Sequence, residues 1–440
     1  MNTAVTNGSP VRRRWNIPWV GQISAREINE YAPTFATEFA VLISQMLVYK
    51  LVAHYLGKGG FSEYAVVRRL VSLIAPVPLL GIGVGLPRYI GFSNGSGDES
   101  AASRYYGAGI CCVIAASVIC VVLMNLMRAR FAFVFFGSNA YAHFVFPLSA
   151  MIIGLCVHTV ACGHFRGHLA MNRANLLQFI NLAVMPPLVF ALIHNDLERI
   201  LLVLGCLWIL IAGAAMVPSV LRIRTIKVLP EAKALLKYGI QRVPGDFTLM
   251  ALFTLPVTVI AHFEGVQQAG YVAFAISAMS MICAVFQPVG LVLLPKATYM
   301  FAEGSHRELR LHVSRLLKMS LLISGSLTLF VYMFAAPLIR LYLGNGYEQV
   351  AGMVRLVVIG SLPYSIYLVL RNVIDAFHKN GVTAVILLIS LAVFCGAVVT
   401  SMFRGLTTPP VVPAFLLALG TMAVASGLEC RRIFVNSGER

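Results

Sequence analysis

Four basic residues lie inside long apolar segments of the chain, at Lys50, Arg68, Arg69 and Arg355. A charged side chain is costly in an apolar environment, so such residues usually face a cavity or a partner. The planar guanidinium of arginine can hold phosphate oxygens through two parallel hydrogen bonds. The four residues are therefore candidate ligands for an anion. Alternatively, each side chain extends along its helix to reach lipid headgroups. Arg68 and Arg69 are adjacent and point about 100° apart on a helix, so they cannot both face one ligand squarely.

Two acidic residues, Glu38 and Asp246, form a second candidate pair, because each lies near the beginning of an apolar segment. A buried carboxylate is easier to protonate than a solvated one, which would suit an acid that takes up and releases a proton. The alternative is a solvated structural role, with Asp246 paired to Arg242 four residues earlier. We expect no catalytic residue and no metal ligand set.

The composition places the segments that carry these residues in a membrane. Hydrophobic residues make up 59% of the 440 positions and charged residues 12%, against about a quarter charged in soluble domains. Apolar runs of about 20 residues recur, each long enough to cross about 30 Å of hydrocarbon. The net charge of +17 comes from short tracts between these runs and forms no long basic face, which argues against a nucleic-acid partner.

The apolar runs predict an all-α integral membrane protein with about twelve transmembrane helices. Most of the 34 basic residues fall at one side when both termini are placed in the cytoplasm, as expected of short cytoplasmic loops. The chain is therefore expected to be a multi-pass protein of the cell inner (cytoplasmic) membrane. The expected spans are 34–56, 65–87, 105–127, 142–162, 174–193, 200–221, 238–262, 270–295, 316–337, 350–370, 382–403 and 409–428.

An internal repeat appears when the chain is compared with itself at an offset of about 208 positions. Residues 53–57 (AHYLG) match 261–265 (AHFEG), 86–88 (LPR) match 294–296 (LPK), and Glu38 falls on Asp246. The matches predict two pseudo-symmetric six-helix bundles around a central cavity, related by an axis along the membrane normal. The expected division is a cytoplasmic tail at 1–32, an N-lobe at 33–228, a C-lobe at 229–430 and a cytoplasmic tail at 431–440.

The turns between the segments resemble those of the polysaccharide-export flippases, within the multidrug/oligosaccharidyl-lipid/polysaccharide exporter superfamily. Residues 49–65 (YKLVAHYLGKGGFSEYA) are similar to the family's "LARYLGPEGFGLYA" turn, and Arg88-Tyr89-Ile90 to its "VRYI" ending. The "YGLP…GIYSVA" and "LFGPEY" patterns have counterparts at 237–240 with 270–273, and at 343–347. One feature departs from the family: residues 258–262 (TVIAH) lack the acidic-basic pair that often ends the seventh helix.

The resemblance implies a V-shaped two-lobed fold and transport of an undecaprenyl-diphosphate-linked oligosaccharide from the cytoplasmic to the periplasmic leaflet, as in O-antigen and exopolysaccharide synthesis. Lys50, Arg68, Arg69 and Arg355 would then bind the diphosphate, and Glu38 and Asp246 would couple transport to protons. The partners would be the lipid-linked oligosaccharide, membrane lipids, and the polymerase and glycosyltransferases of the same pathway, with no cofactor.

Two other functions remain open from the sequence. A cation-coupled multidrug exporter of the same superfamily would share the fold, the repeat and Glu38, but its cationic cargo would be repelled by a basic cavity. A membrane polysaccharide polymerase or ligase would need a long outer loop for its catalytic residues, whereas every expected outer loop is short. The sign of the charge in the cavity distinguishes the flippase from the multidrug exporter.

Overall fold

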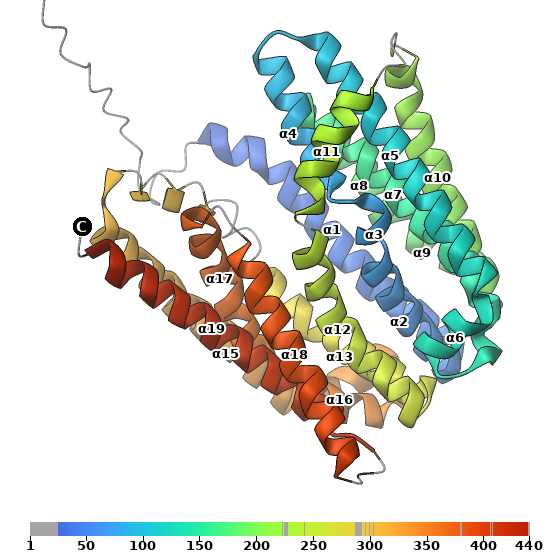
Figure 1. Ribbon diagram of the computed structural model, residues 1–440. Coiled ribbons are helices and arrows are strands. Elements are labelled where there is room, and N and C mark those ends of the chain that lie inside the picture. Colours follow the sequence, from blue (N-terminus) through green and yellow to red (C-terminus); the bar gives the residue numbers. More distant parts are fainter. Residues whose placement is uncertain are drawn as a thin grey trace, which may run out of the picture.

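The chain folds into two bundles of α-helices in the computed structural model (Figure 1), which describes residues 25–438 apart from 222, 224–227, 242, 287–292, 295, 299, 302, 379, 380, 405 and 407. No strand occurs among these residues. The predicted tail at 1–32 lies mostly outside the described residues, and Arg242, the expected partner of Asp246, lies outside them as well.

The first bundle, which we call the N-lobe, consists of the helices from α1 to α10. Proline and glycine residues occur where its chain turns or bends. Its helices are α1 (Ala25–Tyr55), α2 (Gly57–Ile74), α3 (Pro76–Leu79), α4 (Ile82–Gly95), α5 (Glu99–Leu126), α6 (Arg128–Phe136), the short η1 (Asn139–Phe144), α7 (Val145–Gly167), α8 (Met171–Gln178), the π-helical η2 (Phe179–Val184), α9 (Met185–Leu192) and α10 (Leu197–Val220).

The second bundle, the C-lobe, follows the connecting helix α11 (Leu229–Ile240). It consists of α12 (Val243–Phe263), α13 (Val266–Ala284), α15 (His306–Leu343), α16 (Glu348–Val358), α17 (Ser361–Phe377), α18 (Val382–Phe403) and α19 (Val411–Gly438). The helix α19 continues through most of the region expected to be a C-terminal tail. The connecting helix packs on the N-lobe, where Glu231 accepts a hydrogen bond from Arg104 at 2.6 Å.

Ten of these helical stretches are long and apolar enough to cross a membrane. Two further spans are bent pairs, Gly57–Leu79 with Ile82–Gly95 at 45° and Glu348–Val358 with Ser361–Phe377 at 43°, which raises the number to twelve. The first bend is caused by Pro76 and by left-handed backbone at Leu80 (φ 49°) and Gly81 (φ 71°), because both features interrupt the helical hydrogen-bond ladder. The prediction of about twelve transmembrane helices in two pseudo-symmetric bundles is therefore confirmed.

The repeat also explains how the two lobes meet. Equivalent helices of two related bundles approach each other at their common axis, and here α2 of the N-lobe packs along α13 of the C-lobe. Ser62 lies against Gly270, and Arg69 lies against Ser277, both pairs separated by 208 positions. The sequence offset is therefore also the register of the contact between the lobes.

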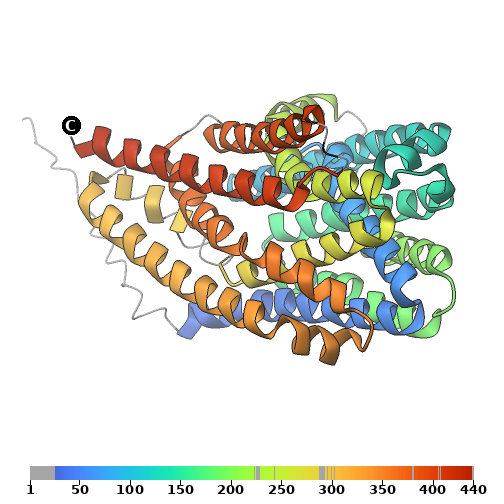
Figure 2. The same ribbon diagram turned by 90° about the horizontal axis from the view of Figure 1, so that it is seen from below.

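The two lobes diverge toward the end of the molecule at which α1 begins (Figure 1). The view from below shows the beginning of α1 and the end of α19 at this same end (Figure 2). At the opposite end the chain turns between α1 and α2, and there the lobes are in contact. We call the diverging end the terminal side and the contacting end the far side.

Candidate functional site

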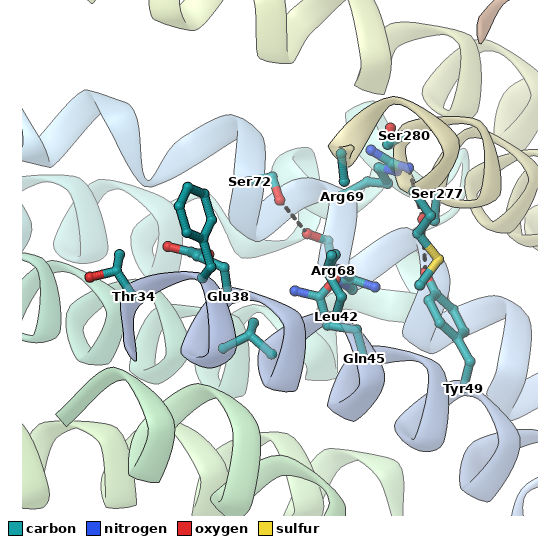
Figure 3. Close-up of a pocket in the computed structure, with 14 residues that line it drawn as sticks. Thr34, Glu38, Leu42, Gln45, Tyr49, Arg68, Arg69, Ser72, Ser277 and Ser280 are labelled. Atoms are coloured by element: carbon teal, nitrogen blue, oxygen red, sulfur yellow. Dashed lines mark hydrogen bonds between the residues drawn. The ribbon is translucent and has the colours of Figure 1, made fainter. Parts of the chain in front are cut away.

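A cavity of about 530 Å³ lies between the lobes, lined by α1 and α2 of the N-lobe and by α13 of the C-lobe (Figure 3). The helix α1 supplies one stripe of side chains, which includes Thr34, Glu38, Gln45 and Tyr49. Their spacing of four, seven and four residues keeps them on one face of a helix. From Thr34 to Tyr49 the stripe extends over about 22 Å at 1.5 Å per residue, so the cavity reaches deep into the protein from the terminal side.

Two arginines of α2 enter this cavity from adjacent positions and turn in different directions, as expected from the helical period. Arg68 donates a short hydrogen bond to Oε1 of Gln45, and its guanidinium carbon lies 5.3 Å from the centre of the Tyr49 ring. Arg69 instead donates to the C-lobe, at 2.8 Å to Oγ of Ser277 and 3.2 Å to the Ala273 carbonyl. Both arginines line the same cavity.

The other two basic candidates lie outside the cavity in this conformation. The Lys50 side chain is exposed on α1 and is not part of the cavity wall. Arg355 lies on α16 and donates from Nε to the Tyr332 carbonyl at 3.2 Å. The structure therefore brings together Arg68 and Arg69, whereas neither Lys50 nor Arg355 is part of the cavity wall.

The two acidic candidates are separated as well. Glu38 lines the cavity, and its Oε1 accepts a hydrogen bond from Nε2 of Gln178 at 2.9 Å. Gln178 in turn accepts one from Arg166 at 2.9 Å, which links the carboxylate to a cation of α7. Asp246 is half-buried near the beginning of α12 and does not line the cavity.

The far side of the cavity is closed by contacts between the lobes. Phe61 and Tyr49 of the N-lobe pack against Phe274 of the C-lobe, with ring centres 5.3 and 5.0 Å apart. A Cβ atom at Gly270 would lie 2.2 Å from the Cα of Ser62, so only glycine allows the two helices to pack this closely. We call this interface, formed by Phe61, Ser62, Gly270 and Phe274 together with the Tyr49 ring, the far seal.

Six uncharged polar residues of the site were missed from the sequence, namely Thr34, Gln45, Tyr49, Ser72, Ser277 and Ser280. Single polar residues in apolar spans are common contacts between helices, so the type of residue alone gave no signal. The stripe at 34, 38, 45 and 49 was a usable signal, because its helical spacing predicts one polar face on an otherwise apolar helix.

Two family models match the chain. The model described as MatE matches residues 33–191, and the model described as "Polysaccharide biosynthesis protein" matches residues 114–352, which is more than half of the 440 residues. A search of the curated proteins finds no match.

Solved structures of transporters share the fold at low sequence identity. A multidrug resistance MATE family transporter of the MOP superfamily, in an inward-facing conformation, aligns with a TM-score of 0.74 at 14% identity, covering 92% of this chain and 96% of its own. The eukaryotic MATE transporter AtDTX14 aligns with a TM-score of 0.67 at 14% identity, covering 94% and 99%. A MOP superfamily transporter from Pyrococcus furiosus, described by a reversed polarity of its binding pocket, aligns with a TM-score of 0.64 at 12% identity, covering 93% and 96%.

The family matches and the fold agree with each other. The resemblance stated from the turns of the sequence is confirmed by the two family models, and the two-lobed architecture is confirmed by the solved structures. The chain belongs to the polysaccharide biosynthesis protein family and is a membrane transporter with the fold of the MOP superfamily.

Proposed function

We propose that this transporter is a flippase that moves an undecaprenyl-diphosphate-linked oligosaccharide from the cytoplasmic to the periplasmic leaflet by alternating access of its two lobes. The observation that carries the proposal is the pair of guanidinium groups, Arg68 and Arg69, in the cavity between the lobes. A diphosphate keeps its negative charge throughout a transport cycle, so a site that removes it from water must supply cations and hydrogen-bond donors.

The size and surroundings of the site fit this role. A volume of about 530 Å³ lies within the range of about 300–1,000 Å³ found for small-molecule sites. The Tyr49 ring and Gln45 hold the Arg68 guanidinium at the cavity wall, which positions the group before any cargo arrives. A positioned guanidinium loses less conformational entropy on binding phosphate than a free one.

A multidrug exporter is the second candidate function, because Glu38 also lines the cavity and the MatE model matches the N-terminal part of the chain. The Pyrococcus furiosus structure is described as a case in which pocket polarity suggests a different function on this fold. Two cations and one acid line the cavity among the described residues, which favours an anionic cargo. Reconstituted vesicles decide between the two functions by comparing transport of a lipid-linked diphosphate with transport of a cationic drug.

The flippase role also requires a location and an orientation. We infer that the chain lies in the cell inner membrane with both termini in the cytoplasm, which makes the terminal side of the cavity the cytoplasmic side. The excess of basic residues in the loops of that side supports this orientation. Reporter fusions behind Asp98 and behind Arg432 are expected to report the cytoplasm, and a periplasmic signal from either would contradict the two-bundle topology.

Proton coupling through Glu38 and Asp246 remains a proposal. If both carboxylates exchange protons during the cycle, changing both to amides removes the exchange, and transport by Glu38→Gln/Asp246→Asn loses its dependence on pH. The measurement is transport per inserted molecule in vesicles across a range of external pH. Because only Glu38 lines the cavity, the two single variants are measured beside the double variant. An unchanged pH profile in the double variant would assign both acids structural roles.

A further inference from the structure

Arg69 crosses the boundary between the lobes at the inner edge of the far seal. It belongs to α2, but its guanidinium donates to two acceptors on α13, Oγ of Ser277 and the carbonyl of Ala273. Arg69 lies seven residues after Ser62, and Ser277 lies seven residues after Gly270. Seven residues are about two helical turns. The contact between Arg69 and Ser277 therefore lies about two turns along α2 and α13 from the contact between Ser62 and Gly270.

The acceptors of Arg69 are held in place by other contacts. Ser277 donates to the Ala273 carbonyl at 2.9 Å, and the Tyr49 hydroxyl lies 3.2 Å from Oγ of Ser277. The backbone of Arg69 has a contact of its own, because Oγ1 of Thr254 donates to the Arg69 carbonyl at 3.4 Å. Arg69 is thus tied to α12 through its backbone and to α13 through its side chain, and both of these helices belong to the C-lobe.

Arg69 also lines the cavity, so its side chain faces a ligand site and a lobe contact at the same time. Its present acceptors are a hydroxyl and a carbonyl, both uncharged. A phosphate oxygen is a stronger acceptor for a guanidinium, because opposite charges add a Coulombic attraction and the planar group can hold two phosphate oxygens at once. A diphosphate in the cavity therefore competes with Ser277 and Ala273 for the same N–H groups.

We propose that Arg69 is a tie between the lobes that anionic cargo releases, with Ser277 as its positioning residue on α13. This inference rests on the proposed function and adds a way in which binding of cargo in the cavity weakens the contacts that close the far seal. When the guanidinium turns to a diphosphate, Arg69 gives up both of its hydrogen bonds to α13. The bond from the Ser62 hydroxyl to the Gln267 carbonyl of α13 remains, and the far seal, held by fewer contacts, opens more readily. Cargo shifts the equilibrium between the closed and the open far seal only if it binds one of these two states more tightly, and the freed Arg69 guanidinium supplies that difference.

The test measures how readily the far seal opens in the full chain reconstituted in vesicles. Ser62 is buried in the seal, so a Ser62→Cys variant reacts with a membrane-impermeant maleimide on the far side only when the seal opens. The parent chain, which keeps its nine native cysteines, gives the background labelling. Undecaprenyl diphosphate is the anionic probe, and undecaprenol is the uncharged control.

The tie predicts a specific pattern of labelling rates. In Ser62→Cys alone, undecaprenyl diphosphate raises the rate and undecaprenol does not. Adding Arg69→Gln raises the labelling rate without any probe by about tenfold or more, because Arg69 donates two hydrogen bonds to α13 and losing even one from a charged group corresponds to about tenfold. It also removes the response to the probe. Arg69→Lys keeps a donor and restores part of the response, and Ser277→Ala gives a smaller rise without probe.

The remaining outcomes separate the two proposals. If Ser62→Cys/Arg69→Gln is labelled without probe no faster than Ser62→Cys alone, the tie is overturned, whatever the cargo is. A raised rate in Arg69→Gln that still responds to the probe would overturn the tie as well, because the arginine would then be structural only. A raised rate in Arg69→Gln, combined with no response of Ser62→Cys to undecaprenyl diphosphate, would keep the mechanical tie and contradict the proposed cargo.

Discussion

Replacing Arg68 and Arg69 together by Gln is expected to reduce transport of lipid-linked sugar on the order of a hundredfold at normal membrane abundance. Hydrogen bonds to charged groups contribute about 1.5–3 kcal/mol each, so losing two such groups removes about 3 kcal/mol or more of cargo binding, and each 1.4 kcal/mol is about tenfold. The measurement is accumulation of lipid-linked sugar in cells that carry each variant as their single copy, normalised to the amount of inserted protein.

Matched controls make this prediction specific to the cavity. Lys50→Gln and Arg355→Gln remove cations from other apolar spans, α1 and α16, outside the cavity wall, and both variants are expected to transport as the parent does. Arg68→Lys with Arg69→Lys keeps the charge and loses the bidentate fork, so an intermediate loss is expected. Full transport by the double Gln variant would remove the basic-cavity hypothesis and favour the drug exporter.

Changing Gly270 to Ala is expected to lower transport on the order of tenfold, because the far seal can no longer close fully. The new Cβ would lie 2.2 Å from the Cα of Ser62, and a backbone atom cannot rotate away as a side chain can. Overpacking of this kind costs about 1–3 kcal/mol, and here the cost falls only on the state in which the lobes touch. Transport per inserted molecule and the labelling rate at the far side are measured together.

The matched control for this variant is Gly352→Ala in α16. A Cβ at Gly352 has no atom within 4 Å, and alanine is the better helix former, so transport and labelling should stay at parental values. In the Ser62→Cys background, Gly270→Ala is expected to make maleimide labelling at the far side faster. It is also expected to make transport slower. Parental transport by Gly270→Ala would show that the contact between Ser62 and Gly270 does not limit the cycle.

Much of the fold was predictable because the bilayer leaves few choices. Apolar length predicted the number of spans, and repeated matches at one offset predicted the two lobes. The contact between Arg69 and Ser277 has the same offset but was not predicted. Span boundaries were less predictable. The expected helix at 65–87 is a bent pair that extends from Gly57 to Gly95, because its proline and glycine residues bend the span and do not end it. The helix α15 extends well beyond the expected 316–337 at both ends, since charged residues continue a helix outside hydrocarbon.

The site was only partly predictable, because apolar periodicity does not say which face of a span meets the other lobe. Arg68 and Lys50 looked equivalent in the sequence as cations within apolar runs, yet Arg68 lines the cavity and Lys50 is exposed. Glu38 and Asp246 are equivalent by the repeat, but only Glu38 lines the cavity. Equivalent positions of the two lobes therefore have different surroundings, because the cavity wall is not symmetric. Ser277 gave no signal in the sequence, because its hydrogen bonds to Tyr49 and Arg69 cross between the lobes.

The central claim, that an anionic lipid-linked sugar is the cargo, is tested most directly by transport in vesicles that contain only this protein. Vesicles are loaded with a fluorescent undecaprenyl-diphosphate-linked sugar, and a membrane-impermeant quencher reports the fraction in each leaflet over time. We predict that the protein speeds the exchange of this lipid between leaflets, that the Arg68→Gln/Arg69→Gln variant does not, and that a fluorescent cationic drug is not transported. Transport of the drug with no movement of the lipid-linked sugar would contradict the proposed function.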